Sequence, residues 1–90
     1  MSVVGQPLLF FMYYVYLLKS LKNSKIYIGY TINISQRLEV HNSGGSIYTR
    51  NDRPWKLVMY LAFESEQKAL EFEKYIKKGS GHAFAKKRFW

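Results

Sequence analysis

Residues 13–18 read YYVYLL and residues 26–30 read IYIGY, and these two stretches decide the fold. Side chains along residues 13–18 alternate between two faces, with Tyr14 and Tyr16 on the same one. The second stretch is rich in β-branched and aromatic residues, as strands are. Residues 19–25 between them are polar and form a connection. The sequence therefore predicts a β-hairpin that brings two tyrosine-bearing strands side by side.

A helix is predicted directly after this hairpin. Asn33 is a suitable N-cap, and Gln36 three residues later completes a capping box. The helix is expected to continue through Val40 or Asn42 and to stop at residues 44–45, where glycine suits a left-handed C-terminal residue. Residues 46–54 then form a basic loop.

The remaining pattern completes a small α+β domain. Residues 55–63 predict a third strand, and Ser65 caps a second helix that runs to about Lys78. The sequence GSG at 79–81 is expected to end that helix, and the tail 82–90 is compatible with a short third helix. The order β-β-α-β-α predicts a small antiparallel three-stranded sheet flanked by helices. We expect residues 12–90 to form this one domain and residues 1–11 to be a loosely held, disordered N-terminal extension.

Charge and composition narrow the class of partner. The 90-residue chain carries a net charge of +8, which attracts polyanions, so nucleic acid is favoured over an acidic protein or a membrane surface. A basic protein without such a partner stays open as the alternative. There is no cysteine, so a metal would need oxygen or imidazole ligands, and a cytoplasmic location fits. The apolar run 8–18 is too short to span a bilayer, so no membrane association is expected.

Charged and polar residues interrupt the apolar stripes of both helices. Arg37 and His41 lie on the i, i+3, i+4, i+7 stripe that starts at Ile34, and Glu73 lies on the stripe that starts at Ala69. A buried charge without a partner costs several kcal/mol, so each must be paired, neutralised or placed at a cleft. Arg37 and Glu73 either form a salt bridge between the helices or belong to a functional site. His41 is either a packed histidine or a phosphate contact.

Five residues follow one another in a characteristic order and spacing: Tyr16, Tyr27, Arg37, His41 and Glu73. With the tripeptides YVY at 14–16 and YIG at 27–29, this set resembles the GIY-YIG nuclease superfamily over about residues 13–78. The chain looks like a small standalone member, similar to the catalytic domain of the excision-repair nuclease. The resemblance implies an endonuclease that hydrolyses DNA phosphodiester bonds, with a link to DNA repair.

The resemblance also implies a role for each residue of the set. Tyr27 would activate the attacking water, and Tyr16 would orient that water or contact the phosphate. Arg37 would donate to the phosphate, His41 would lie near it, and Glu73 would hold one divalent ion, Mg²⁺ or Mn²⁺. A phenol with a pKa near 10 is mostly protonated at neutral pH, so Arg37 or the ion would have to lower it.

Three departures from the family pattern keep a second reading open. The first motif is Tyr-Val-Tyr instead of Gly-Ile-Tyr, Tyr30 stands near the position of a lysine in the excision-repair nuclease, and no asparagine follows Asn51. A non-catalytic nucleic-acid-binding module on the same fold is therefore the alternative function.

Five further basic residues are expected to contact DNA: Arg50, Arg53, Lys86, Lys87 and Arg88. Their alternative is a solvated charged face. Phosphate contacts carry no sequence information, so we expect branched or damaged DNA to be preferred over a fixed sequence. The sequence leaves the oligomeric state open.

Overall fold

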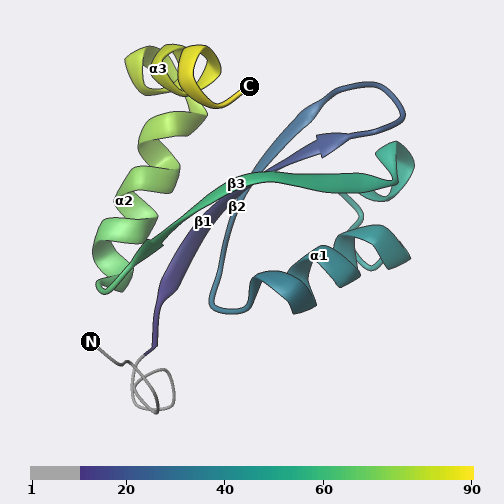
Figure 1. Ribbon diagram of the computed structural model, residues 1–90, viewed down its shortest axis with the longest axis horizontal. Helices are drawn as coiled ribbons and strands as arrows, with labels where there is room; N and C mark the ends of the chain where they lie inside the picture. The colour runs from purple at the N-terminus through teal and green to yellow at the C-terminus, as the bar shows by residue number, and fades with distance from the viewer. Residues whose placement is uncertain (1–10) are drawn as a thin grey trace, which may run out of the picture.

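The computed structural model describes residues 11–90, and its elements follow the order β-β-α-β-α-α (Figure 1). They are β1 (Tyr13–Ser20), β2 (Ile26–Thr31), α1 (Ile34–Ser43), the short 3₁₀ helix η2 (Arg50–Asp52), β3 (Trp55–Phe63), α2 (Glu66–Lys77) and α3 (Gly79–Phe89). The predicted α+β class is confirmed. The expected extension at 1–11 lies outside the described residues except for Phe11, which is exposed.

The sheet is antiparallel throughout and has the strand order β2-β1-β3, so β1 is central and β2 and β3 are its edges. In this register the Cα atom of Tyr16 pairs with Gly29 on β2 and with Tyr60 on β3. The alternation predicted for β1 therefore places successive side chains on opposite faces of a sheet that has helices on both sides.

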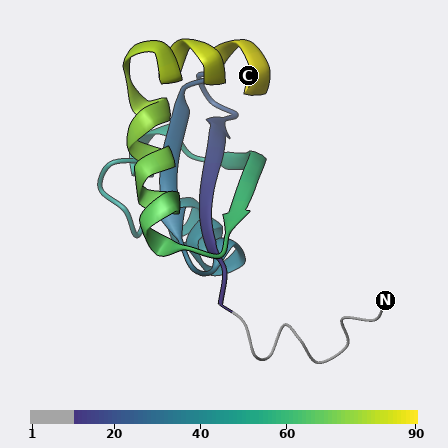
Figure 2. The same cartoon turned by 90° about the vertical axis from the view of Figure 1, so that its left-hand side faces the viewer.

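One face of the sheet is packed by apolar residues against α2 and α3. Its buried cluster comprises Val15, Leu17, Ala69, Ile76 and Ala85. Figure 2 shows α2 running along the sheet and α3 crossing its end. This face forms the larger apolar core.

The other face is covered by α1, which lies across the sheet from α2 (Figure 1). Tyr16, Leu18 and Trp55 form its buried cluster. His41 and Thr49 are also buried on this side, with relative exposures of 0% and 1%. The smaller core therefore contains polar side chains as well as apolar ones.

The helix boundaries follow the predicted caps. The Asn33 side chain accepts a hydrogen bond from the Gln36 amide at 3.1 Å, and the Ser65 hydroxyl accepts one from the Lys68 amide at 3.2 Å. Gly44 ends α1 with φ of 87°, a left-handed conformation that glycine adopts without penalty.

α2 ends at Lys77, just before residues 79–81, as predicted, but these three residues do not form a loop. These residues start α3, which follows α2 directly, with the change of direction at Gly79, where φ is 67°. Gly81 is buried, and a Cβ atom there would collide with the carbonyl oxygen of Tyr75. The second glycine therefore serves a close approach between two helices and not a loop. Within residues 11–90 no helix is both long enough and apolar enough to cross a membrane.

Candidate active site

The phenol of Tyr16 lies over the backbone of the neighbouring strand. A Cβ atom on Gly29 would collide with the Tyr16 ring and hydroxyl, so only glycine leaves room for this side chain. Tyr16 is 1% exposed. The glycine of the YIG tripeptide thus positions the tyrosine of the first tripeptide, its partner in the β1–β2 register.

A buried hydrogen-bond chain holds the Tyr16 hydroxyl. Its oxygen lies 2.9 Å from Nε2 of His41, and Nδ1 of His41 lies 2.7 Å from Oγ1 of Thr49. Burial, together with the positive charge of Arg37, lowers the pKa of His41, so the imidazole is neutral near pH 7. A neutral ring has one donor and one acceptor nitrogen, which ties Thr49, His41 and Tyr16 into one chain.

The His41 side chain is fully buried, and both ring nitrogens have protein partners. The role of His41 near the scissile phosphate stays a prediction. In the structure His41 is a packed histidine, which lies beneath Tyr16 and orients it. Thr49, in the predicted basic loop, was not foreseen as its partner.

Several charges act on the same phenol. Burial raises the pKa of Tyr16 to about 12, and the neighbouring charges of Tyr27 and Glu73 act in the same direction. The positive charge of Arg37 opposes this rise in pKa. Since burial prevails, Tyr16 is a neutral phenol at physiological pH.

Tyr27 lies beside this hydroxyl and is less enclosed. Its ring centroid is 4.8 Å from that of His41, 6.2 Å from that of Tyr16 and 6.3 Å from that of Trp55. Among residues 11–90 the Tyr27 hydroxyl has no hydrogen-bond partner, although the ring is half-buried. Its oxygen is thus available to a water molecule or a phosphate.

Glu73 approaches from α2, which packs against the opposite face from α1. Its negative charge adds a small rise to the pKa of Tyr16 and to that of Tyr30 on the edge strand β2. The Glu73 side chain is 18% exposed, and its carboxylate pairs with Nζ of Lys77 at 3.0 Å. In the described part of the chain Arg37 is not its partner, so the salt bridge between the helices, one of the two alternatives for this pair, is not formed.

A metal ion would find few protein ligands at this edge. Residues 11–90 contain no group of three or more His, Cys, Asp or Glu side chains that could hold a metal. Mg²⁺ keeps several of its waters and is often bound through one or two carboxylates, so a single glutamate fits it. Glu73 is the carboxylate near Tyr16 that could hold such an ion if Lys77 moved away from it.

Comparison with known proteins bears on this arrangement. Residues 12–88 match the GIY-YIG catalytic domain. The chain belongs to the GIY-YIG family. It is also 46% identical over 68 residues to the UPF0213 protein CPE1444 of Clostridium perfringens, covering 74% of this chain and 72% of that protein.

Two further relatives are of the same small type. The UPF0213 protein SH2523 of Staphylococcus haemolyticus is 42% identical over 66 residues, which cover 72% of this chain and 79% of that protein. The solution NMR structure of the UPF0213 protein BH0048 from Bacillus halodurans aligns with a TM-score of 0.51 at 36% identity, covering 83% of this chain and 80% of that one. The chain is thus a member of the UPF0213 group of small GIY-YIG proteins, while the finer likeness to the excision-repair nuclease stays a hypothesis.

The basic residues of this GIY-YIG domain fall into two groups. Arg50 and Arg53 share a hollow of about 470 Å³ with Lys22, which sequence reasoning had not singled out. The Arg53 guanidinium covers Gly44, and its Nε donates to the Arg50 carbonyl at 2.7 Å. The second group lies exposed on α3: Lys86, Lys87 and Arg88.

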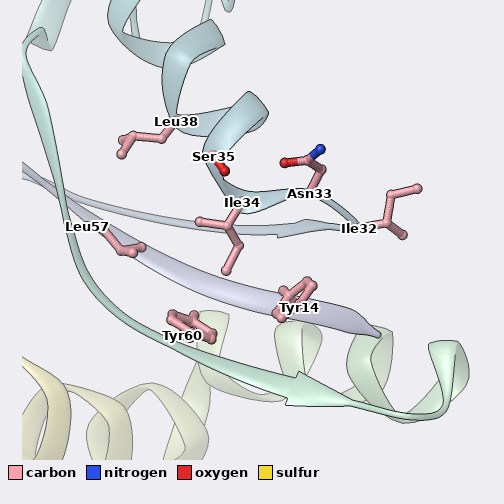
Figure 3. A pocket seen from close by; sticks show the side chains of 8 residues that line it. All are labelled: Tyr14, Ile32, Asn33, Ile34, Ser35, Leu38, Leu57 and Tyr60. Carbon is pink, nitrogen blue, oxygen red and sulfur yellow. The ribbon is translucent and has the colours of Figure 1, made fainter. Parts of the chain in front are cut away.

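Another hollow, of about 480 Å³, opens between the first turn of α1 and β3 (Figure 3). The rings of Tyr14 and Tyr60 meet there edge to face, with centroids 5.7 Å apart. None of the predicted site residues lines it. It is therefore separate from the Tyr16 site, although both lie on the α1 side of the sheet.

Proposed function

We propose that this GIY-YIG protein is an endonuclease that hydrolyses DNA phosphodiester bonds with one divalent ion, Mg²⁺ or Mn²⁺. One observation carries the proposal: Tyr16 and Tyr27, the tyrosines of the two tripeptides, lie together on β1 and β2 with ring centroids 6.2 Å apart, in a chain that matches the GIY-YIG catalytic domain over residues 12–88. Phosphodiester hydrolysis needs an oriented water, a group that accepts its proton and positive charge at the phosphate, which Tyr27, Arg37 and an ion held by Glu73 would supply.

The two tyrosines take different roles in this proposal. Because its pKa is about 12, Tyr16 keeps its proton near pH 7. In this proposal Nε2 of His41 donates to the Tyr16 oxygen, which leaves the phenol proton to donate to the water or the phosphate. Tyr27, whose hydroxyl is open to an incoming group, accepts the proton of the attacking water as a phenolate. His41 and Thr49 hold the Tyr16 oxygen in place.

Arg37 and Glu73 supply the charge. The planar guanidinium of Arg37 donates to the phosphate as negative charge builds up there. Glu73 would hold the ion, and a bound ion adds positive charge to the phosphate and to the leaving oxygen. Lys77 is the side chain that has to release the Glu73 carboxylate first.

Binding of DNA is proposed to rest on the basic surface. The net charge of +8 favours a polyanion, and Lys22 joins Arg50 and Arg53 in one hollow of basic character. The α3 group of Lys86, Lys87 and Arg88 would contact other phosphates of the same DNA, away from the hollow of Lys22, Arg50 and Arg53. These contacts select shape instead of sequence, so branched or damaged DNA in the cytoplasm, and a role in DNA repair, belong to the same proposal.

Cleavage with a charge-neutral variant tests the proposal. Wild-type protein should cut plasmid, branched or single-stranded DNA with Mg²⁺ or Mn²⁺ and should not cut with EDTA. Glu73→Gln keeps the size of the side chain but removes the charge that holds the ion, so cleavage should fall while DNA binding persists. Glu71→Gln is the matched control, because Glu71 is exposed on the same helix.

The pairing of Glu73 with Lys77 favours one alternative, a binding module that does not cut. Wild-type protein that binds DNA but cleaves none of these substrates with either ion would establish that alternative. Equal activity of Glu73→Gln and Glu71→Gln would remove Glu73 from the mechanism.

A further inference from the structure

A hollow of about 300 Å³ adjoins the candidate site at the edge strand β2. Its walls come from three elements: Ile26, Tyr27 and Ile28 of β2, Lys77 of α2, and His82 and Trp90 at the two ends of α3. Figure 2 shows the end of α3 next to the β1–β2 hairpin. Neither His82 nor Trp90 has a part in the proposed cleavage.

Two of the walls connect this hollow to the chemistry proposed above. Tyr27 is the proposed proton acceptor, and Nζ of Lys77 lies 3.0 Å from the Glu73 carboxylate. If the phosphate of a nucleotide lay at Tyr27 and Glu73, the hollow would be beside it. The base of the same nucleotide could then reach into the hollow.

The side chains in the hollow suit a nucleobase. The rings of His82 and Trp90 meet at 68° with centroids 5.4 Å apart, and both residues are half-buried. Two isoleucines add an apolar wall, and Lys77 provides a cation at the side of the site. Single-stranded nucleic acid is commonly bound by aromatic rings on which bases stack, next to positive charge that contacts the backbone. The volume is at the lower end of small-molecule sites, which suits one base.

We propose that this hollow binds one nucleobase of the nucleotide next to the scissile phosphate, stacked on Trp90. The inference rests on the proposed nuclease function and specifies its substrate class. A base can enter only when it is unpaired and unstacked, so the substrate is single-stranded, frayed or branched DNA at the point of cleavage. The net charge of +8 favours such a strand over a second copy of this equally basic chain as the occupant.

Tryptophan fluorescence tests the proposal without any cleavage. The protein has two tryptophans, and Trp55 is only 4% exposed with its Nε1 bonded to the Thr49 carbonyl, so a change on binding reports Trp90. The probes, in EDTA, are a thymidine octamer, an octamer of abasic deoxyribose phosphate and a duplex of the same length. We expect the thymidine octamer to quench the emission and the other two to bind without quenching it.

Two variants at position 90 and one control complete the design. Trp90→Leu should weaken binding of the thymidine octamer about tenfold, because one stacked base is lost, and should leave binding of the abasic octamer unchanged. Trp90→Phe keeps a ring and should retain most of the affinity while losing the quenching. Phe84→Leu is the control, since Phe84 is a half-exposed aromatic on α3 outside this hollow and should change neither affinity.

Equal affinity of wild-type protein for the thymidine and abasic octamers would overturn the proposal, as would equal quenching by the duplex. Equal weakening of both octamers by Trp90→Leu and Trp90→Phe would show that position 90 serves the fold or phosphate binding alone. Failure of the nuclease proposal is seen separately, as absence of cleavage with Mg²⁺ and Mn²⁺ in a protein whose Trp90 is still quenched by the thymidine octamer.

Discussion

The two faces of this sheet are packed with different chemistry. Against α2 and α3 the strand β1 contributes Val15 and Leu17, which join an entirely apolar buried cluster. Against α1 the same strand contributes Tyr16, whose hydroxyl enters a buried chain of hydrogen bonds with His41 and Thr49. Neighbouring residues of one strand therefore serve different ends, one face stabilising the fold and the other fixing a functional group.

The difference has an energetic reason. Apolar burial is favourable wherever it occurs, whereas a buried hydroxyl or imidazole costs free energy unless every polar atom finds a partner. In residues 11–90 no buried side-chain nitrogen or oxygen lacks a hydrogen-bond partner. The α1 face thus avoids the penalty of buried polar groups, and it gains a tyrosine whose position is defined on both sides, by Gly29 and by His41.

The largest expected effect belongs to the apolar face. Leu17→Ala removes a fully buried side chain and leaves a cavity, so the free energy of unfolding should fall by about 2–5 kcal/mol. Cleavage per folded molecule should not change, because Leu17 points away from Tyr16. Urea unfolding and activity at low temperature separate the two quantities. Loss of activity in molecules shown to be folded would contradict the division between the faces.

Arg37→Ala should have the opposite effects: a large loss of cleavage rate and little loss of stability. Arg37 is half-buried and its charge acts on Tyr16, so its removal should lower the cleavage rate about 10²–10³-fold, as loss of one transition-state donor does. The melting temperature should change little, since the described residues give Arg37 no carboxylate partner. Gln36→Ala, exposed on the same helix, is the control. A strongly destabilised but fully active Arg37→Ala would assign the residue to the fold.

The comparison between faces also shows how much the sequence could predict. Alternation in residues 13–18 and the caps at Asn33, Gly44 and Ser65 are local signals, and the sheet and helices formed as expected. Partners remote in sequence have no such signal: Thr49 looks like any loop residue until the fold brings it to His41. Gly81 was assigned to the stop after the second helix for the same reason. A glycine after a helix locally indicates a stop, whereas its close approach to Tyr75 is a tertiary contact.

Gly29→Ala should disturb the packing of Tyr16 on β1 against Gly29 on β2 by adding a single carbon atom. The new Cβ would collide with the Tyr16 ring, so the ring must shift or the strands must separate, at a cost of about 1–3 kcal/mol for overpacking. Cleavage should fall more than stability, because the Tyr16 hydroxyl would leave its place on Nε2 of His41. The double variant Gly29→Ala with Tyr16→Ala, which removes the ring, should be less destabilised than the sum of its parts, measured by a double-mutant cycle. Additive free energies would show that the two residues do not interact.

The smallest expected effect is an acid dependence of stability that only the polar face shows. His41 has a lowered pKa in the folded protein because burial and Arg37 disfavour the imidazolium, whereas in the unfolded chain its pKa is near 6.5. The folded state therefore binds this proton less readily, so the stability contributed by neutral His41 is present above pH 6.5 and is lost as the pH falls through the folded-state pKa.

Urea unfolding at pH 7.5, 6.0 and 5.0 measures that loss. His41→Gln, which can still offer a donor and an acceptor to Tyr16 and Thr49, should be less stable at pH 7.5 but should lose less further stability on acidification than wild type. His82→Gln, at the edge of the β2 hollow, is the matched control and should keep the wild-type acid dependence. If His41→Gln became unstable with acid as steeply as wild type does, protonation would be acting elsewhere. The buried Thr49–His41–Tyr16 chain would then not be the acid-sensitive part of the α1 face.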